Sequence, residues 1–153
     1  ELKKRGQVCR CIRCREVKTH DVDFDTLTLG DMVYHPSRAE EHFLTYTTPE
    51  ERIAGYLRLS LPAPDAPQMN VPDLEGAALI REVHVYGQSL PLGTDKEGAA
   101  QHIGLGTGLL RRSEEIARER GYKQMAVIAA IGTRLYYASR GFRLGGLYMI
   151  KDL

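Results

Sequence analysis

The feature that most constrains the fold is a change in hydrophobic periodicity across a proline-rich segment, residues 62–72. Before it, residues 53–61 alternate with period two, as in a strand with one buried face. After it, residues 106–120 follow the helical period, and residues 124–131 are apolar almost throughout, as in a strand buried on both faces. Because proline removes amide donors, residues 62–72 are predicted to form a loop between two halves. Strands followed by alternating strands and helices predict a mixed α/β sheet with helices packed against it.

The remaining elements follow from the same patterns. The predicted strands cover part of 24–34, then 42–46, 78–86 and 144–150, with a hairpin connection at 47–50, a polar loop at 87–100 and a short helix at 133–139. Leu109, Leu110, Ile116 and Ala117 form the apolar stripe of the long helix. Gly121 follows that helix, where a glycine that ends a helix belongs.

The composition is that of one ordinary globular domain. The chain has 153 residues, of which 42% are hydrophobic and 27% are charged. No stretch approaches the roughly 18 to 20 apolar residues that span a bilayer, and no signal peptide opens the chain, so no membrane partner is expected. The chain begins at Glu1 and is already basic there, which favours a fragment of a longer protein.

A basic arm precedes a mildly acidic body. Residues 1–18 hold seven basic residues against two acidic ones, whereas the remainder holds fourteen against eighteen. This asymmetry favours an anionic partner such as nucleic acid. The alternative is a solvated linker whose charges keep it soluble.

All three cysteines lie in this arm, at Cys9, Cys11 and Cys14. An odd number at such close spacing is unlike a secreted disulfide framework and indicates a reducing, cytoplasmic location. The C-x-C-x-x-C spacing offers three thiolate ligands to a tetrahedral zinc or iron, with His20 the nearest candidate for a fourth. Three free thiols are the alternative.

A glycine-rich segment at residues 101–108 is predicted to be a loop that opens the long helix. The unpaired N–H groups of a first helical turn suit a pyrophosphate. A P-loop would need Lys-Ser/Thr after the last glycine, but two leucines follow. A dinucleotide fold would need a strand directly before the glycines and an acidic residue about 20 positions later, and both are missing. The acyl-CoA signature Gln/Arg-x-x-Gly-x-Gly/Ala fits Gln101, Gly104 and Gly106, and a simple capping turn remains the alternative.

Motifs on both sides of this segment resemble one family. These are Arg-Glu-Val-His-Val-Tyr-Gly at 81–87, Gln-His-x-Gly-x-Gly at 101–106, Ser-Glu-Glu-Ile-Ala-Arg-Glu at 113–119, Ile-Gly-Thr-Arg-x-Tyr-Tyr at 131–137 and Tyr-Met-x-Lys at 148–151. Together they resemble the catalytic subunit of Elongator in a bacterial or archaeal form, from about Cys9 to the end of the chain.

The resemblance implies a GNAT acetyltransferase domain, in which helices flank a mostly antiparallel sheet that splays at the cofactor site. Members of that family join this domain to a radical-SAM domain and modify the wobble uridine of tRNA. Residues 21–153 would then bind and cleave acetyl-CoA, and residues 1–20 would be the linker to the second domain. S-adenosylmethionine and an iron–sulfur cluster would belong to that missing domain, because the three cysteines lack its spacing.

The resemblance also implies where the chemistry lies. The pantetheine would enter between strands 78–86 and 124–131, where backbone N–H groups near Val83, His84 and Val85 would polarise the acetyl carbonyl. Glu82 or His84 would act as the base, unless Glu82 pairs with an arginine and His84 is a core imidazole.

Tyr136 or Tyr137 would protonate the departing sulfur, unless both only pack. Adjacent residues on a helix point about 100° apart, so only one of the two should face the sulfur. Arg134 is a candidate for the CoA phosphates or for tRNA. The cofactor-binding residues implied are Val83, His84, Val85, Gln101, His102, Ile103, Gly104, Leu105, Gly106, Thr107, Gly108, Arg134, Tyr136 and Tyr137.

Three functions therefore compete. The first is the acetyl-CoA domain of a tRNA-modifying enzyme. The second is a freestanding N-acetyltransferase that acts on protein lysine or a small molecule. The third is a non-catalytic module that binds tRNA and CoA.

Overall fold

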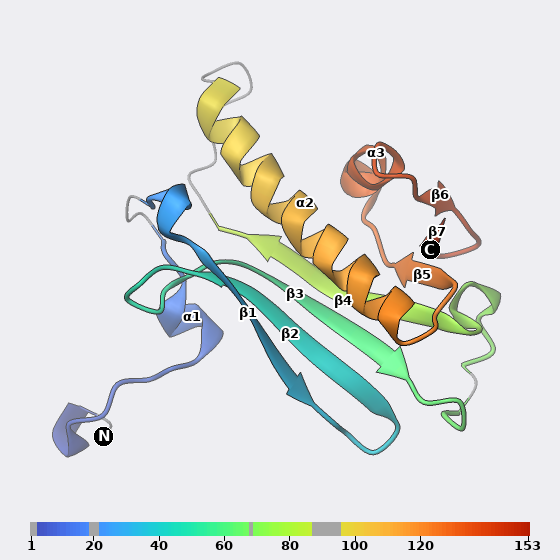
Figure 1. Cartoon of the computed structure of the whole chain (residues 1–153), viewed down its shortest axis with the longest axis horizontal. Helices are drawn as coiled ribbons and strands as arrows, with labels where there is room; N and C mark the ends of the chain where they lie inside the picture. The colour runs from blue at the N-terminus through green and yellow to red at the C-terminus, as the bar shows by residue number, and fades with distance from the viewer. Residues whose placement is uncertain (1–2, 19–21, 68, 87–95) are drawn as a thin grey trace.

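The centre of the molecule is a seven-stranded sheet in the order β1-β2-β3-β4-β5-β7-β6 (Figure 1). The computed structural model describes residues 3–18, 22–67, 69–86 and 96–153, with side chains from residue 4 and, in the last range, from residue 104. The strands are β1 Thr28–Tyr34, β2 Ala39–Thr47, β3 Ile53–Pro62, β4 Ala77–Val85, β5 Gln124–Val127, β6 Arg143–Leu144 and β7 Met149–Asp152. Only β4 and β5 pair in parallel, and every other neighbouring pair is antiparallel. The predicted mixed, mostly antiparallel sheet is confirmed.

One long helix lies across a face of this sheet (Figure 1). The helices are α1 Ile12–Arg15, α2 Lys96–Glu119 and α3 Arg134–Ala138, with 3₁₀ turns at Lys3–Arg5, Phe24–Thr26, Pro72–Leu74 and Ile131–Thr133. As predicted, Gly121 ends α2: its φ is +84°, and the next N–H returns to the carbonyl of Ala117. Within the described residues, no helix has the length and apolar character needed to cross a membrane.

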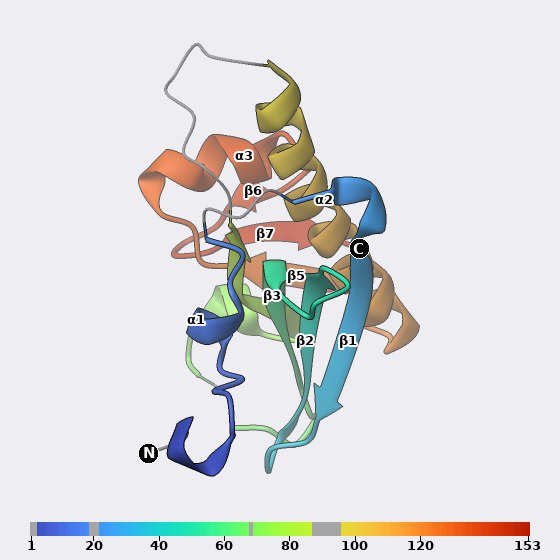
Figure 2. The same ribbon diagram turned by 90° about the vertical axis from the view of Figure 1, so that its left-hand side faces the viewer.

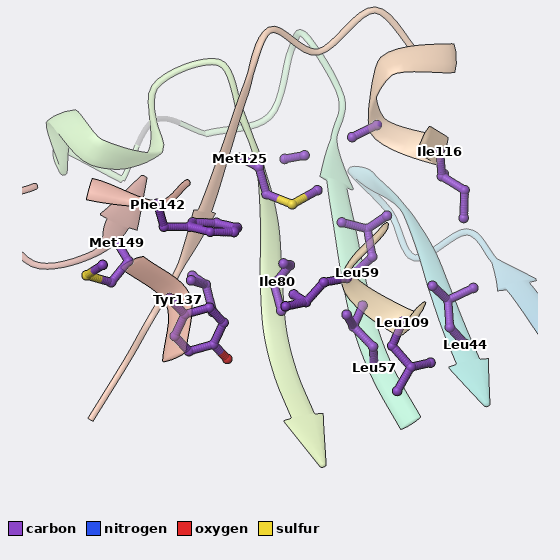
Figure 3. Packing of buried hydrophobic residues seen from close by; sticks show 14 of the residues in the cluster. Leu44, Leu57, Leu59, Ile80, Leu109, Ile116, Met125, Tyr137, Phe142 and Met149 are labelled. Atoms are coloured by element: carbon purple, nitrogen blue, oxygen red, sulfur yellow. The ribbon is translucent and has the colours of Figure 1, made fainter. Parts of the chain in front are cut away.

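The core fills the space between α2 and the sheet (Figure 3). Leu57 and Leu59 from β3 meet Leu109 and Ile116 from α2, and all four side chains are fully buried. Each such side chain stabilises the fold by about 1.5 to 3 kcal/mol. The alternating pattern of β3 and the stripe of α2 therefore face each other, as their periodicities predict.

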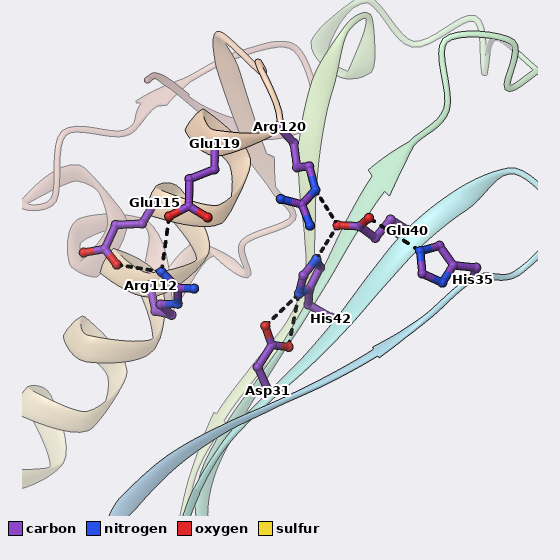
Figure 4. Close-up of polar contacts among 8 residues, drawn as sticks. All are labelled: Asp31, His35, Glu40, His42, Arg112, Glu115, Glu119 and Arg120. Carbon is purple, nitrogen blue, oxygen red and sulfur yellow. Dashed lines mark hydrogen bonds and ion pairs between the residues drawn. The ribbon is translucent and has the colours of Figure 1, made fainter.

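A polar cluster ties the edge strand β1 to the rest of the sheet (Figure 4). His42 of β2 is 3% exposed, and its Nδ1 and Nε2 lie 2.9 Å from Asp31 and 2.8 Å from Glu40. Each ring nitrogen thus lies within hydrogen-bonding distance of a carboxylate, so His42 bridges β1 and β2. Arg120, just beyond α2, also donates to Glu40 at 2.9 Å. The His42 hydrogen bond and Arg120 lower the pKa of Glu40.

Two predicted strands near the C-terminus are wrong in extent. The strand expected at 124–131 ends at Val127, and Ile128 and Ile131 are 60% and 82% exposed. The strand expected at 144–150 is instead the hairpin of β6 and β7, because two glycines at 145–146 allow a tight turn. The carboxylate of Asp73 holds that turn by accepting from the N–H groups of residues 146–148.

Candidate functional site

The parallel strands β4 and β5 pair over only part of their length. The paired residues are Ala77–Ile80 of β4 and Gln124–Val127 of β5. Because β5 ends there while β4 continues to Val85, residues 81–85 have no partner on the β5 side within the described part of the chain. Backbone N–H and C=O groups need partners when they are buried, so this splay can accept a ligand that supplies them. This unpaired stretch of β4 lies where the family resemblance predicts the sheet to splay.

A β-bulge in β4 begins where the splay begins. Opposite β3, Arg58 pairs with Glu82 and Leu59 pairs with Ile80, which leaves Arg81 as an extra residue. A bulge shifts the alternation of side chains by one position. Glu82 therefore points away from the core, although Ile80 two positions earlier is fully buried in it.

Figure 2 shows α3 beside α2, and Tyr136 of α3 contacts Gly106 of α2. Gly106 of α2 is buried, and a Cβ built on it would lie 2.5 Å from the Tyr136 hydroxyl and 3.7 Å from Val85 Cγ2. Gly108, two residues on, makes similar room for the hydroxyl of Tyr46. The glycines thus allow α2 to approach α3 and the free end of β4 closely.

The glycine segment is not a loop, and this corrects the prediction from the sequence. α2 begins at Lys96, so Gly104, Gly106 and Gly108 lie inside it, and the unpaired N–H groups of its first turn are some ten residues earlier. Glycine costs about 1 kcal/mol in a helix, but Leu105 and Leu109 bury their side chains here and offset that cost. The side chains of Gln101, His102 and Ile103, and residues 87–95, where the sequence predicts a polar loop, lie outside the described residues.

The two adjacent tyrosines of α3 differ in their surroundings. Tyr137 is 7% exposed and packs edge-on against Phe142 in the core (Figure 3). Tyr136 is half-buried and places its hydroxyl over Gly106. Burial raises the pKa of both phenols, so both keep their protons at neutral pH. Of the two, only Tyr136 has its hydroxyl against α2 at the splay.

Arg140 is a site residue that the sequence analysis missed. Its guanidinium stacks on the Tyr136 ring, 3.6 Å from the centroid, and its Nη2 donates to Thr107 Oγ1 at 2.8 Å. The four-residue spacing from Tyr136 is the signal that could have found it. Arg134 differs, because its Nε is buried and unpartnered among the described residues. Such an orphaned donor fits an acceptor group of a ligand.

Glu82 and His84 occupy the face of β4 opposite to Val83 and Val85. The Tyr56 hydroxyl donates a short hydrogen bond to Glu82, and Arg58 lies 4.0 Å from the same carboxylate. The His84 ring stacks on Tyr56 with centroids 5.8 Å apart.

Burial and the neighbouring Glu82 carboxylate raise the pKa of Tyr56, so its proton stays on the phenol. The salt bridge expected as the alternative role of Glu82 is thus present with Arg58. Tyr56 was not singled out from the sequence, although it shares a strand face with Arg58.

The structure brings the three cysteines together. The sulfur atoms of Cys9, Cys11 and Cys14 lie within 4.8 Å of one another, with Cys9 half-buried and the others exposed. A hydrogen bond with the backbone of Cys14 lowers the pKa of Cys11. A hydrogen bond with the Cys11 side chain raises the pKa of Cys14 to about 11. Tetrahedral zinc needs sulfurs about 3.8 Å apart, so small adjustments would fit the metal. His20 lies outside the described residues.

Comparison with known proteins gives relatives for nearly the whole chain. The tRNA uridine(34) acetyltransferase of Dehalococcoides mccartyi is 38% identical over 99% of this chain and 34% of its own length. Elongator complex protein 3 of Danio rerio is 37% identical over 99% of this chain and 28% of its own length. The chain therefore spans about a third of these relatives. No protein-family profile matches it.

Two solved structures are also similar to this chain. Elp3 of the archaeon Methanocaldococcus infernus, with an N-terminal deletion, superposes with a TM-score of 0.80 at 32% identity, over 99% of this chain and 37% of that one. A Klebsiella pneumoniae structure assigned as an acyl-CoA N-acyltransferase gives a TM-score of 0.53 at 15% identity, over 83% and 97%. The second similarity concerns the fold alone. The expected acyl-CoA N-acyltransferase fold is confirmed.

Proposed function

From the homology of this chain to part of Elongator complex protein 3 and of tRNA uridine(34) acetyltransferase, we propose that it is the acetyl-CoA-binding and acetyl-CoA-cleaving domain of a tRNA-modifying enzyme. The observation that carries the proposal is the splay between β4 and β5, closed on one side by Gly106 and Tyr136. Backbone groups of β4 without a strand partner, with a protonated phenol nearby, suit a thioester.

The residues proposed to contact the thioester and those proposed to act as the base lie on opposite sides of β4. When bound, acetyl-CoA supplies an acetyl group activated as a thioester. Backbone N–H groups near Val83, His84 and Val85 would polarise its carbonyl oxygen. Tyr136 holds a proton that it can deliver to the thiolate as that group leaves.

Glu82 and His84, on the opposite face, are the candidate bases for the attacking group. Glu82 accepts a hydrogen bond from Tyr56 at Oε1, which leaves Oε2 to take a proton. Arg134, with its orphaned Nε, is proposed to meet a polar group of the cofactor. Gln101, His102, Ile103, Gly104, Leu105, Thr107, Gly108 and Tyr137 remain proposed cofactor neighbours.

The N-terminal arm is proposed to serve the rest of the enzyme. Its cysteines would hold one zinc ion, and its basic residues would lie against tRNA or a radical-SAM domain in a cytoplasmic enzyme. Elemental analysis of freshly purified protein should find close to one zinc per chain, and Cys11→Ser should reduce it. Folded protein without metal would refute the zinc site.

Binding is tested first. Saturating acetyl-CoA should raise the melting temperature, because a ligand that binds only the folded state stabilises it. Gly106→Glu should remove this shift by placing a side chain against Tyr136 and Val85, whereas Gly30→Glu, on the distant edge strand β1, should keep it. No shift in the unaltered protein would overturn the proposal.

The acceptor is tested by following free CoA in three mixtures. One contains acetyl-CoA alone, one adds tRNA, and one adds a lysine peptide. Release stimulated by tRNA supports the proposal. Release only with the peptide favours a protein N-acetyltransferase, and binding without release favours a non-catalytic module.

A further inference from the structure

Arg140 follows α3 and links it to α2. All three nitrogens of its guanidinium donate hydrogen bonds. Nε and Nη2 donate to Thr107 Oγ1 at 3.2 and 2.8 Å. Nη1 donates to the carbonyl oxygen of Tyr136 at 2.8 Å and to Ser139 Oγ at 3.1 Å. The guanidinium plane also covers the Tyr136 ring, with Cζ 3.6 Å from its centroid. One side chain therefore fixes both the backbone and the ring of Tyr136 and ties them to α2.

These contacts limit where the Tyr136 hydroxyl can point. The ring has Arg140 on one face and the edge of Tyr137 nearby, with ring centroids 5.2 Å apart. Its hydroxyl ends over Gly106, at a spot where a Cβ would lie only 2.5 Å away. Rotation of the ring away from Gly106 would break the stacking with Arg140. A planar guanidinium suits this role, because it can stack and donate in a fixed fork at the same time.

We propose that Arg140 is a positioning residue that holds the Tyr136 phenol against Gly106, at the splay of β4 and β5. It acts through Tyr136 and Thr107 and does not itself need to touch the thioester. This inference rests on the proposed function for its catalytic meaning, since it assumes that Tyr136 delivers a proton to the sulfur. The positioning itself is a property of the free protein.

The free protein therefore gives the first test. With isotope-labelled protein, nuclear Overhauser contacts between the Tyr136 ring and the Gly106 α-protons should be present in the unaltered chain. They should disappear in Arg140→Met, which keeps much of the stem but removes the charged plane. They should persist in Arg143→Met, a control in which an exposed arginine loses its ion pair with Asp152 and its attraction to Asp73, both remote from Tyr136. Unchanged contacts in Arg140→Met would refute the positioning, whether or not acetyl-CoA binds.

Kinetics of CoA release give the second test. Arg140→Met should lower kcat about tenfold or more with KM nearly unchanged, because a displaced acid loses part of a contribution of about 10² to 10⁴. Arg140→Lys keeps the charge without the fork and should recover only part of that loss. In a Tyr136→Phe background, Arg140→Met should have no further effect on kcat, because residues that act through one another are not additive.

The two proposals fail in different ways. An additional loss of kcat in the Tyr136→Phe background would mean that Arg140 acts independently and would overturn its positioning role. A large rise in KM alone would make Arg140 a binding residue instead. If the unaltered chain neither binds nor cleaves acetyl-CoA, the proposed function fails, and the nuclear Overhauser contacts still decide the positioning.

Discussion

Paired substitutions at Gly104 and Gly106 test how α2 is built at the site. A Cβ at Gly104 meets nothing within 4 Å, and the residue is exposed inside the helix. Gly104→Ala should therefore gain the full helix-propensity difference, about 1 kcal/mol. For a domain of about 150 residues this corresponds to a rise of about 2–4 °C in melting temperature.

Gly106→Ala gains the same propensity but meets the Tyr136 hydroxyl at 2.5 Å. The ring must move by about 1 Å to reach ordinary contact, which costs about 0.5–1.5 kcal/mol in an off-rotamer side chain. Moving it also weakens the stacking on Arg140, a contact of about 0.5–1 kcal/mol where exposed. Gly106→Ala should thus be about 1–2 kcal/mol less stable than Gly104→Ala.

Urea denaturation of the two variants and the unaltered protein, followed by circular dichroism, measures these differences directly. The two changes have the same chemistry and lie two residues apart, so each controls for the other. Gly104→Ala with unchanged or reduced stability would contradict a helix that begins at Lys96. Equal stability of the two variants would contradict the tight contact with Tyr136.

Three further predictions concern the stability of regions away from the proposed site. Asp73→Ala should destabilise the protein more at pH 7 than at pH 3. The amides of the 145–148 turn lower the pKa of Asp73, so the stabilisation by its carboxylate fades as pH falls below about 4. Thermal melts at both pH values measure this, and an equal loss of melting temperature at the two would contradict it. Lys151→Met should cost about 1.5 kcal/mol, because it removes the 2.6 Å partner of the buried Glu114 but leaves Arg118 at 3.3 Å, and adding Glu114→Gln should recover part of the loss. His42→Leu should cost about 2 kcal/mol or more in urea denaturation, because two carboxylates lose the hydrogen-bond partner between them, and a variant as stable as the original would refute that bridge.

The sequence alone determined where most strands lie along the chain and, through the family resemblance, the fold. The period-two pattern of 53–61 became β3, and the stripe from Leu109 to Ala117 became the buried face of α2, because both patterns report which side chains must leave water. Gly121 ended α2 as predicted, since its positive φ is a local property. The motifs that resembled Elongator also predicted a site between β4 and β5, and that site stays a prediction.

Only the tertiary structure decided how the site is assembled. Three glycines in five residues predicted a loop locally, but buried leucines and phenols from distant strands and helices stabilise a helix there. The contrast between Tyr136 and Tyr137 depends on which one meets Phe142 and which one meets Gly106, and neighbours in sequence cannot report this. The bulge at Arg81 and the contacts of Arg140 also arise from pairing across the fold, where long-range packing overrides local preference.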